Sequence, residues 1–152
     1  RLKALMSEIW FYRLEGRSVA DVLPTLLEKS MERGWRTVVE CGNADAIPKI
    51  SQRLWSYRDD AFLAHGHEGD GTQQPIWLTA GSDNPNGAKA RLYIEGAVPG
   101  EVSGLDRAMY IFEKEDETAI EAARERWKQA KAEGLNVRYF IFAEGKWNEQ
   151  KG

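Results

Sequence analysis

Short apolar runs, rich in β-branched and aromatic residues, recur along this chain and are separated by segments of a different pattern. Runs of this kind are typical of strands that are buried on both faces of a sheet. They predict strands at residues 8–14, 36–41, 76–79, 90–95, 108–113 and 136–142. We expect the last of these strands to close the sheet.

Between these runs, apolar residues recur every three or four positions, as they do on the buried face of a helix. One such segment starts at Ser18 and ends at Gly34. Pro24 lies inside it, which predicts either a kink or a regular helix that begins near Asp21. A second helix is predicted over about 43–57, with an Asn or Asp cap and a proline in its first turn.

A third helix is predicted between Thr118, which forms a capping box with Glu121, and a stop at Gly134. At about 100° per residue, its small apolar stripe consists of Ile120, Ala123, Trp127, Ala130 and Gly134, and the neighbouring basic stripe consists of Arg124, Lys128 and Lys131. Trp127 lies on the seam between the two stripes. This arrangement is suited to an acidic partner with an aromatic end, whereas the alternative is a core tryptophan beside solvated cations.

The alternation of strands and helices at both ends of the chain predicts an α/β fold. We expect a Rossmann-like, doubly wound and mostly parallel sheet with helices on both faces. The expected single domain covers residues 8–147. Residues 1–7 are interpreted as an N-terminal extension or cloning remnant, and residues 148–152 as a polar tail.

Composition narrows the possible functions. The net charge of -3 argues against general binding of nucleic acid through its phosphates, and against direct single-strand binding by stacking on the tryptophans. Cys41 is the one cysteine, so an internal disulfide is excluded and a reducing, cytoplasmic location fits. No apolar run approaches the ~20 residues of a membrane span, so we expect no membrane contact.

Motifs for nucleotide binding are absent. The first strand is followed by Glu15-Gly16-Arg17-Ser18, which has a single glycine in place of GxGxxG. The sequence GxxxxGK[ST] does not occur either, so closely spaced backbone N–H groups for a phosphate are not expected. Cys41 ends a predicted strand with no basic neighbour in sequence, which favours a buried structural thiol over a nucleophile.

A long loop over 58–75 holds the remaining candidates for chemistry. It contains His65 and His67, with acidic residues nearby at Asp59, Asp60, Glu68 and Asp70. A metal site needs three or four converging ligands, so this pattern favours exposed loop histidines, and we expect no metal and no cofactor. The alternative function is a small α/β enzyme or nucleotide-binding domain that uses this loop.

Aromatic side chains flank the start of the same loop. Trp55 is out of phase with the apolar face of its predicted helix, and Phe62 follows a few residues later. Exposed aromatic residues beside a loop suggest a protein-binding patch. The alternative is that both side chains cover the open edge of the core.

Taken together, several segments resemble one protein family. EIWFYRL, GWRTVVE, LWSYRDDAFLAHG, PIWLTAGSDNPNGA and RERWKQAKAEG occur in this order from about Glu8 to Trp147. The ordered set is similar to the chi subunit of bacterial DNA polymerase III holoenzyme. The resemblance implies a Rossmann-like, non-catalytic accessory protein of the clamp loader, without nucleotide chemistry or cofactor.

The resemblance also implies two partners. One is the acidic C-terminal tail of the single-stranded-DNA-binding protein, and the residues that match the tail-binding helix of the family are Arg124, Trp127, Lys128 and Lys131. Some family members have tyrosine in place of Trp127 and arginine in place of Lys131. The other partner is the psi subunit of the clamp loader, and Trp55 and Phe62 match the patch that faces it.

Overall fold

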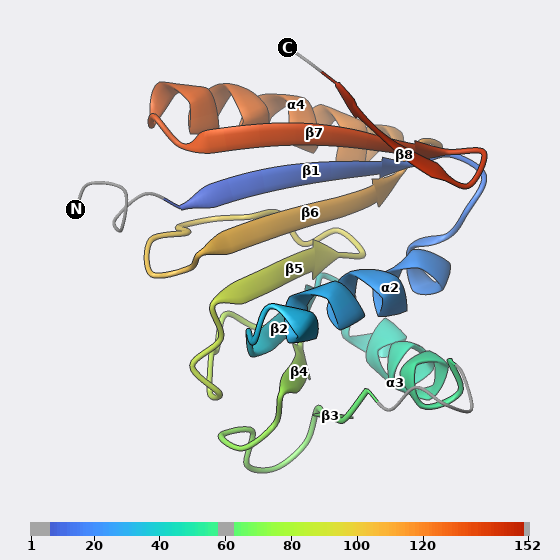
Figure 1. Ribbon diagram of the computed structural model, residues 1–152, viewed down its shortest axis with the longest axis vertical. Helices are drawn as coiled ribbons and strands as arrows, with labels where there is room; N and C mark the ends of the chain where they lie inside the picture. Colours follow the sequence, from blue (N-terminus) through green and yellow to red (C-terminus); the bar gives the residue numbers. More distant parts are fainter. Residues whose placement is uncertain (1–6, 58–62, 151–152) are drawn as a thin grey trace.

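The computed structural model describes residues 7–57 and 63–150, which form one eight-stranded sheet flanked by helices (Figure 1). The strands are β1 (Glu8–Leu14), β2 (Thr37–Cys41), β3 (His65–Gly66), β4 (Ile76–Thr79), β5 (Ala90–Ile94), β6 (Arg107–Glu113), β7 (Asn136–Ala143) and β8 (Lys146–Gln150). Their order across the sheet is β3-β4-β2-β5-β6-β1-β7-β8. All neighbours pair in parallel except β7 and β8, which are antiparallel.

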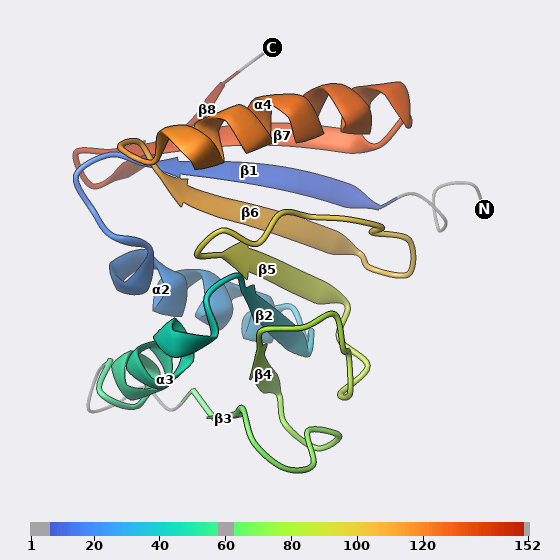
Figure 2. The ribbon, with the colours of Figure 1, turned by 180° about the vertical axis from the view of Figure 1, so that it is seen from behind.

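The helices lie on both faces of this sheet. α2 (Val19–Glu32) and α3 (Ile47–Trp55), the latter preceded by the 3-10 turn η1 (Ala44–Ala46), pack on one face. α4 (Glu117–Ala132) packs on the other, as seen when the molecule is turned around (Figure 2). The expected doubly wound, mostly parallel α/β fold is therefore confirmed. No helix in the described part of the chain is long and apolar enough to cross a membrane.

Each face of the sheet has its own core. The α2 and α3 side buries mainly aliphatic residues, among them Leu14, Leu23, Leu27, Val39, Leu54, Ile76, Leu92 and Ile111. The α4 side combines aromatic strand residues with small helix residues, among them Phe11, Tyr93, Tyr110, Phe112, Ala119, Ala123 and Ala130. Because the helix contributes alanines, α4 lies close to the rings of the strands.

The pairing of β1 with β7 forms the surface on which α4 lies. β1 pairs with β7 in a register that places Phe11 beside Tyr139, and their rings stack with centroids 6.0 Å apart. Both rings are on the face that α4 covers. The result is an aromatic platform directly under the helix that the sequence singled out.

The prediction that the strand at 136–142 closes the sheet is wrong, because β8 pairs along the outside of β7. The residues that we expected to form a polar tail from 148 onward are strand as far as Gln150. Glu144 and Gly145 form the two-residue connection and both have positive φ, 53° and 76°, as in the tight turns that join antiparallel strands. β3 was also missed, since it is a short strand inside the predicted 58–75 loop.

The helix ends agree with the sequence predictions only in part. α4 is capped by Asp116, whose Oδ1 accepts a hydrogen bond from the Ala119 N–H at 3.0 Å, and not by Thr118. α2 begins directly after its cap Ser18, so the predicted start of the helical segment at Ser18 is confirmed; it continues through Pro24, and the alternative of a regular helix that begins near Asp21 is wrong. The predicted stop of α4 is confirmed: Gly134 has a φ of 80° just after the helix.

Candidate functional site

A groove of about 310 Å³ lies along α4, between this helix and the strands β1, β7 and β8. It is lined by Arg13 from β1, Ile120, Ala123, Arg124 and Trp127 from α4, Tyr139 from β7 and Gln150 from β8. Of the predicted helix, the apolar-stripe residues Ile120, Ala123 and Trp127 and one member of the basic stripe, Arg124, therefore share a concave surface. Concave surfaces with an apolar floor and a few polar groups are typical ligand sites.

Trp127 forms the floor of this groove. Its ring centroid lies 5.7 Å from that of Phe11 and 5.8 Å from that of Tyr139, which it meets edge-on. The side chain is only partly buried, so part of the indole stays accessible from the groove. Trp127 therefore packs on the core with one side of its ring and leaves the other side accessible, and its role in binding a partner stays a prediction.

The cations lie around this ring with different surroundings. Arg124 lines the groove and donates to Glu121 at 2.9 Å in an exposed pair. The Nζ of Lys131 lies 5.5 Å from the centre of the Trp127 ring, a cation–π distance. Lys128 is exposed on the same helix but does not line the groove. Within residues 7–57 and 63–150, Lys128 and Lys131 have no ion-pair partner.

Arg13 and Tyr139 belong to the groove although the helical pattern could not indicate them. The Nη2 of Arg13 donates to Glu15 at 2.9 Å, while its Nε is buried and has no hydrogen-bond partner among the described residues. Burial raises the pKa of the Tyr139 hydroxyl, and the charges of Arg13 and Arg124 oppose part of that rise. Side chains alternate between the two faces of a strand, so Ile9, Phe11 and Arg13 share one face of β1. This alternation is the sequence signal that could have placed Arg13 beside the aromatic core.

A buried arginine holds the far side of α4. Arg126 is 6% exposed; its Nε donates to the carbonyl of Pro99 at 2.9 Å and its Nη2 to that of Gly100 at 3.0 Å. Its Nη1 lies 3.5 Å from a carboxylate oxygen of Glu133. These contacts tie the segment after β5 to the helix, and so fix the helix that carries the groove. No pattern in the sequence distinguishes Arg126 from the other cations of this helix.

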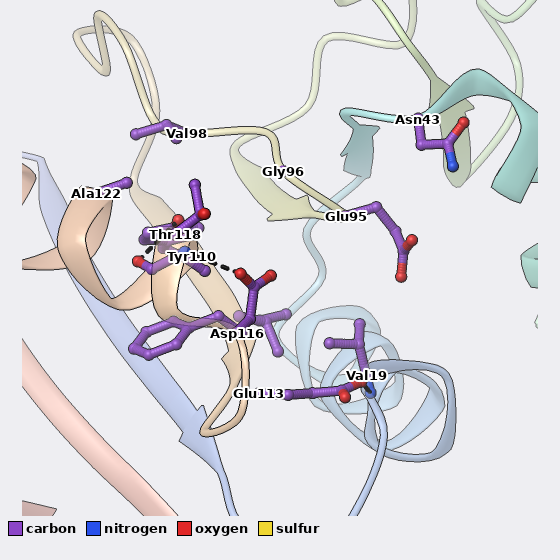
Figure 3. Close-up of a pocket in the computed structure, with 13 residues that line it drawn as sticks. Val19, Asn43, Glu95, Gly96, Val98, Tyr110, Glu113, Asp116, Thr118 and Ala122 are labelled. Atoms are coloured by element: carbon purple, nitrogen blue, oxygen red, sulfur yellow. Dashed lines mark hydrogen bonds between the residues drawn. The ribbon is translucent and has the colours of Figure 1, made fainter.

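A second hollow of about 370 Å³ lies at the carboxyl ends of the strands, where doubly wound sheets commonly bind nucleotides (Figure 3). Here the Val19 N–H at the start of α2 donates to Glu113 at 2.9 Å. Asp116 occupies the start of α4 in the same way. Since acidic side chains already occupy both helix starts, and Glu95 adds a further carboxylate to the lining, the hollow is poorly suited to phosphate.

The described part of the long loop, residues 63–75, holds both histidines, and they have different surroundings. His65 is buried, so the expectation of exposed loop histidines was wrong for it. Its Nδ1 donates to the Leu63 carbonyl at 2.7 Å, and its Nε2 therefore accepts from Ser51 at 2.8 Å. Asp59 and Asp60 lie outside the described residues. The described residues contain no group of three or more potential metal ligands.

Burial lowers the pKa of His65. It also raises the pKa of the Cys41 thiol, which is buried at the end of β2, and this favours the protonated thiol. The prediction that Cys41 is a buried thiol is confirmed.

Trp55 is the last residue of α3, and this helix lies on the opposite side of the sheet from α4, which carries the groove (Figures 1 and 2). It is 52% exposed, and its ring lies over that of His65 with centroids 4.2 Å apart. The expected exposure of Trp55 is therefore confirmed. Its predicted neighbour Phe62 lies outside the described residues.

Comparisons with known proteins agree on one family. A family model described as DNA polymerase III chi subunit, HolC, matches residues 6–138. The DNA polymerase III subunit chi of Pseudomonas aeruginosa is 24% identical over 109 residues, which cover 72% of this chain and 76% of that protein. The subunit of the same name from Haemophilus influenzae is 24% identical over 125 residues, covering 79% and 85%.

Proposed function

Since the chain belongs to the family of the DNA polymerase III chi subunit, we propose that it binds the acidic C-terminal tail of the single-stranded-DNA-binding protein and links it to the clamp loader through a psi-type partner. Family membership makes it a replication accessory subunit and confirms the resemblance inferred from sequence. In this role it would be a non-catalytic cytoplasmic adaptor. The observation that carries the tail proposal is the groove along α4.

The chemistry of the groove is complementary to such a tail. A tail that ends in aspartates followed by Ile-Pro-Phe has an apolar ring at one end and carboxylates before it. The ring would pack on the accessible side of Trp127, above Phe11 and Tyr139. Arg124, Lys128 and Lys131 would hold the carboxylates through charge-assisted hydrogen bonds.

The size of the groove predicts a weak interaction. A cavity of about 310 Å³ takes one large side chain and its neighbours, so the buried area is far below that of a stable protein complex. We expect a Kd of roughly micromolar order that rises with salt, because the cations are exposed. Many tails on one coated strand would raise the avidity.

The psi-type partner would use the other side of the sheet. Trp55 is a large, exposed aromatic residue, and such residues often anchor protein interfaces. His65 lies beneath it and is fixed by two hydrogen bonds, which gives the exposed ring a rigid support. Phe62 is proposed as the second contact on the strength of the family resemblance.

The test is fluorescence anisotropy of a labelled peptide ending in Asp-Asp-Ile-Pro-Phe, titrated at low and high salt. We expect saturable binding that weakens with salt, with Trp127→Ala and with Lys128→Ala. Lys29→Ala, an exposed lysine in the last turn of α2 on the other face, is the matched control and should bind like the wild type. Absence of binding at ~100 μM protein would refute the tail proposal.

A further inference from the structure

We infer that Arg13 of β1 joins Arg124 in holding the terminal carboxylate of the tail, and that this second guanidinium, supplied by the sheet, determines how strongly the groove prefers a free chain end over an internal acidic-aromatic sequence. This inference rests on the proposed tail binding and assigns a specificity-determining role to a residue of β1. Arg13 comes from the sheet and Arg124 from the helix, and both line the one cavity that also holds Trp127.

Arg13 has hydrogen-bonding capacity that the fold does not use. A guanidinium has five N–H donors, and among the described residues this one interacts with the carboxylate of Glu15, at 2.9 Å, and with the hydroxyl of Tyr139, which leaves further donors available. The Nε–H is buried without a partner, which is costly for a charged group. The side chain is nevertheless 31% exposed, so its outer nitrogens remain accessible to a ligand in the groove.

The two guanidiniums flank a common neighbour. Tyr139 lines the groove between the strand that carries Arg13 and the helix that carries Arg124. The positive charge of each arginine lowers the pKa of the Tyr139 hydroxyl against the effect of burial, which indicates that both charges act at this point. A carboxylate placed above Tyr139 would therefore meet positive charge from two sides.

The covalent structure of the tail separates the roles of the cations. The carboxylate of a terminal phenylalanine is attached to the same residue as its ring, so a ring on Trp127 brings that carboxylate within the cavity. The nearest aspartate precedes the phenylalanine by three residues, about 10 Å along an extended chain. Arg13 and Arg124 line the cavity itself, whereas Lys128 lies outside it on α4. Hence the cavity arginines suit the terminal carboxylate and the outer lysine suits the aspartates.

The experiment is a double-mutant cycle between Arg13 and the peptide end. The peptide ending in Asp-Asp-Ile-Pro-Phe is prepared as the free acid and as the C-terminal amide, and both are titrated into wild type and Arg13→Gln. Arg17→Gln is the matched control, because Arg17 is an exposed arginine outside the groove whose nearest ion-pair contact is 4.0 Å. Thermal melting checks that each variant is folded, and Arg13→Lys replaces Arg13→Gln if the latter is not.

We expect the wild type and Arg17→Gln to bind the acid roughly tenfold more tightly than the amide, as for one charge-assisted contact. Arg13→Gln should bind the acid about as weakly as the amide, and Arg13→Lys should lose several-fold of the preference because it lacks the planar fork. Equal binding of acid and amide by wild type, or an unchanged preference in the Arg13 variant, would overturn the inference while leaving tail binding intact. Failure of both peptides to bind wild type would instead refute the proposed function.

Discussion

The backbone N–H of Val19 donates to the carboxylate of Glu113 at 2.9 Å, so the start of α2 is occupied by an acid from the end of β6. In doubly wound nucleotide-binding domains, the corresponding helix start receives a phosphate. Here the same geometry binds a side chain of the protein itself. The contact joins the first helix to the central sheet and leaves the position unsuited to an added anion.

The Glu113 contact should contribute to stability. Glu113→Ala leaves a helix N–H without its acceptor, and we expect a loss of about 1 kcal/mol in the free energy of unfolding. Urea denaturation of wild type and variant measures this. Glu115→Ala, an exposed acid two residues later, is the control and should change the value by less than about 0.5 kcal/mol. Equal effects of the two substitutions would show that the contact to Val19 does not stabilise the fold.

Nucleotides and divalent metals should not stabilise the wild-type protein. Acidic side chains occupy the helix starts at the carboxyl edge of the sheet, and His65 is already engaged by Ser51 and Leu63. A thermal-shift screen with nucleotides, together with metal analysis of the purified protein, checks both points. A large nucleotide shift, or metal in a stoichiometric amount, would favour the alternative of a small enzyme that uses the 58–75 loop.

Arg126 and Arg124 are two residues apart on α4 and should behave in opposite ways. Arg126→Ala removes two hydrogen bonds from a buried guanidinium to the carbonyls of Pro99 and Gly100, so we expect a loss of about 2–3 kcal/mol in stability. Arg124→Ala should leave stability within about 0.5 kcal/mol and weaken tail binding, because its side chain is exposed and lines the groove. Urea denaturation and peptide anisotropy, measured on both variants, provide the comparison. A larger loss of stability in Arg124→Ala, or a larger loss of peptide affinity in Arg126→Ala, would contradict a structural role for Arg126 and a binding role for Arg124.

His65 should make stability depend on pH. Its pKa is lowered in the folded state, so the unfolded chain binds a proton more readily, and stability is expected to fall as the pH decreases below about 6.5. Urea denaturation at pH 7.5, 6.5 and 5.5 measures the slope, which should be smaller in His65→Asn. That variant should also lose roughly 1 kcal/mol at neutral pH through its hydrogen bonds. His67→Asn serves as the control, and parallel profiles for wild type and His65→Asn would contradict the prediction.

Trp55→Ala should not change tail affinity. Trp55 ends α3 on one side of the sheet, and the groove lies along α4 on the other. We expect the peptide Kd to stay within about twofold of wild type, while binding to a psi-type partner weakens at least tenfold, as for an interface anchor. Peptide anisotropy and calorimetric titration with the partner distinguish the two effects. If Trp55→Ala weakened the binding of the tail peptide and of the psi-type partner equally, the two ligands would share one surface.

Most of the sheet was predictable because parallel strands buried on both faces carry continuous apolar runs, as EIWFYRL and AMYIFE do. The missed strands lack that signal. β3 has two residues, and β8 has the sequence KWNEQ, in which Trp147 is the one apolar side chain. β8 forms because the Glu144-Gly145 turn returns the chain along β7. The antiparallel pairing with β7 then stabilises a strand whose own residues have little preference for strand structure.

The helical half of the groove was also predictable, since the positions of Arg124 and Trp127 follow from the repeat of one helix. Arg13 and Tyr139 could not be added in the same way. Their place beside α4 depends on the register between β1 and β7, and a slip of one residue would turn each side chain to the other face. Arg126 is a similar case, because its burial depends on carbonyls of Pro99 and Gly100 that lie far away in sequence.

The position of α3 and α4 on opposite faces of one sheet has a kinetic consequence. A ligand in the groove beside Trp127 and a protein over Trp55 would not share a surface residue, and the buried sheet lies between them. Neither encounter would have to wait for the other. Assembly with two partners would then follow a random order, and the lifetime of each contact could be adjusted by mutation without changing the lifetime of its counterpart.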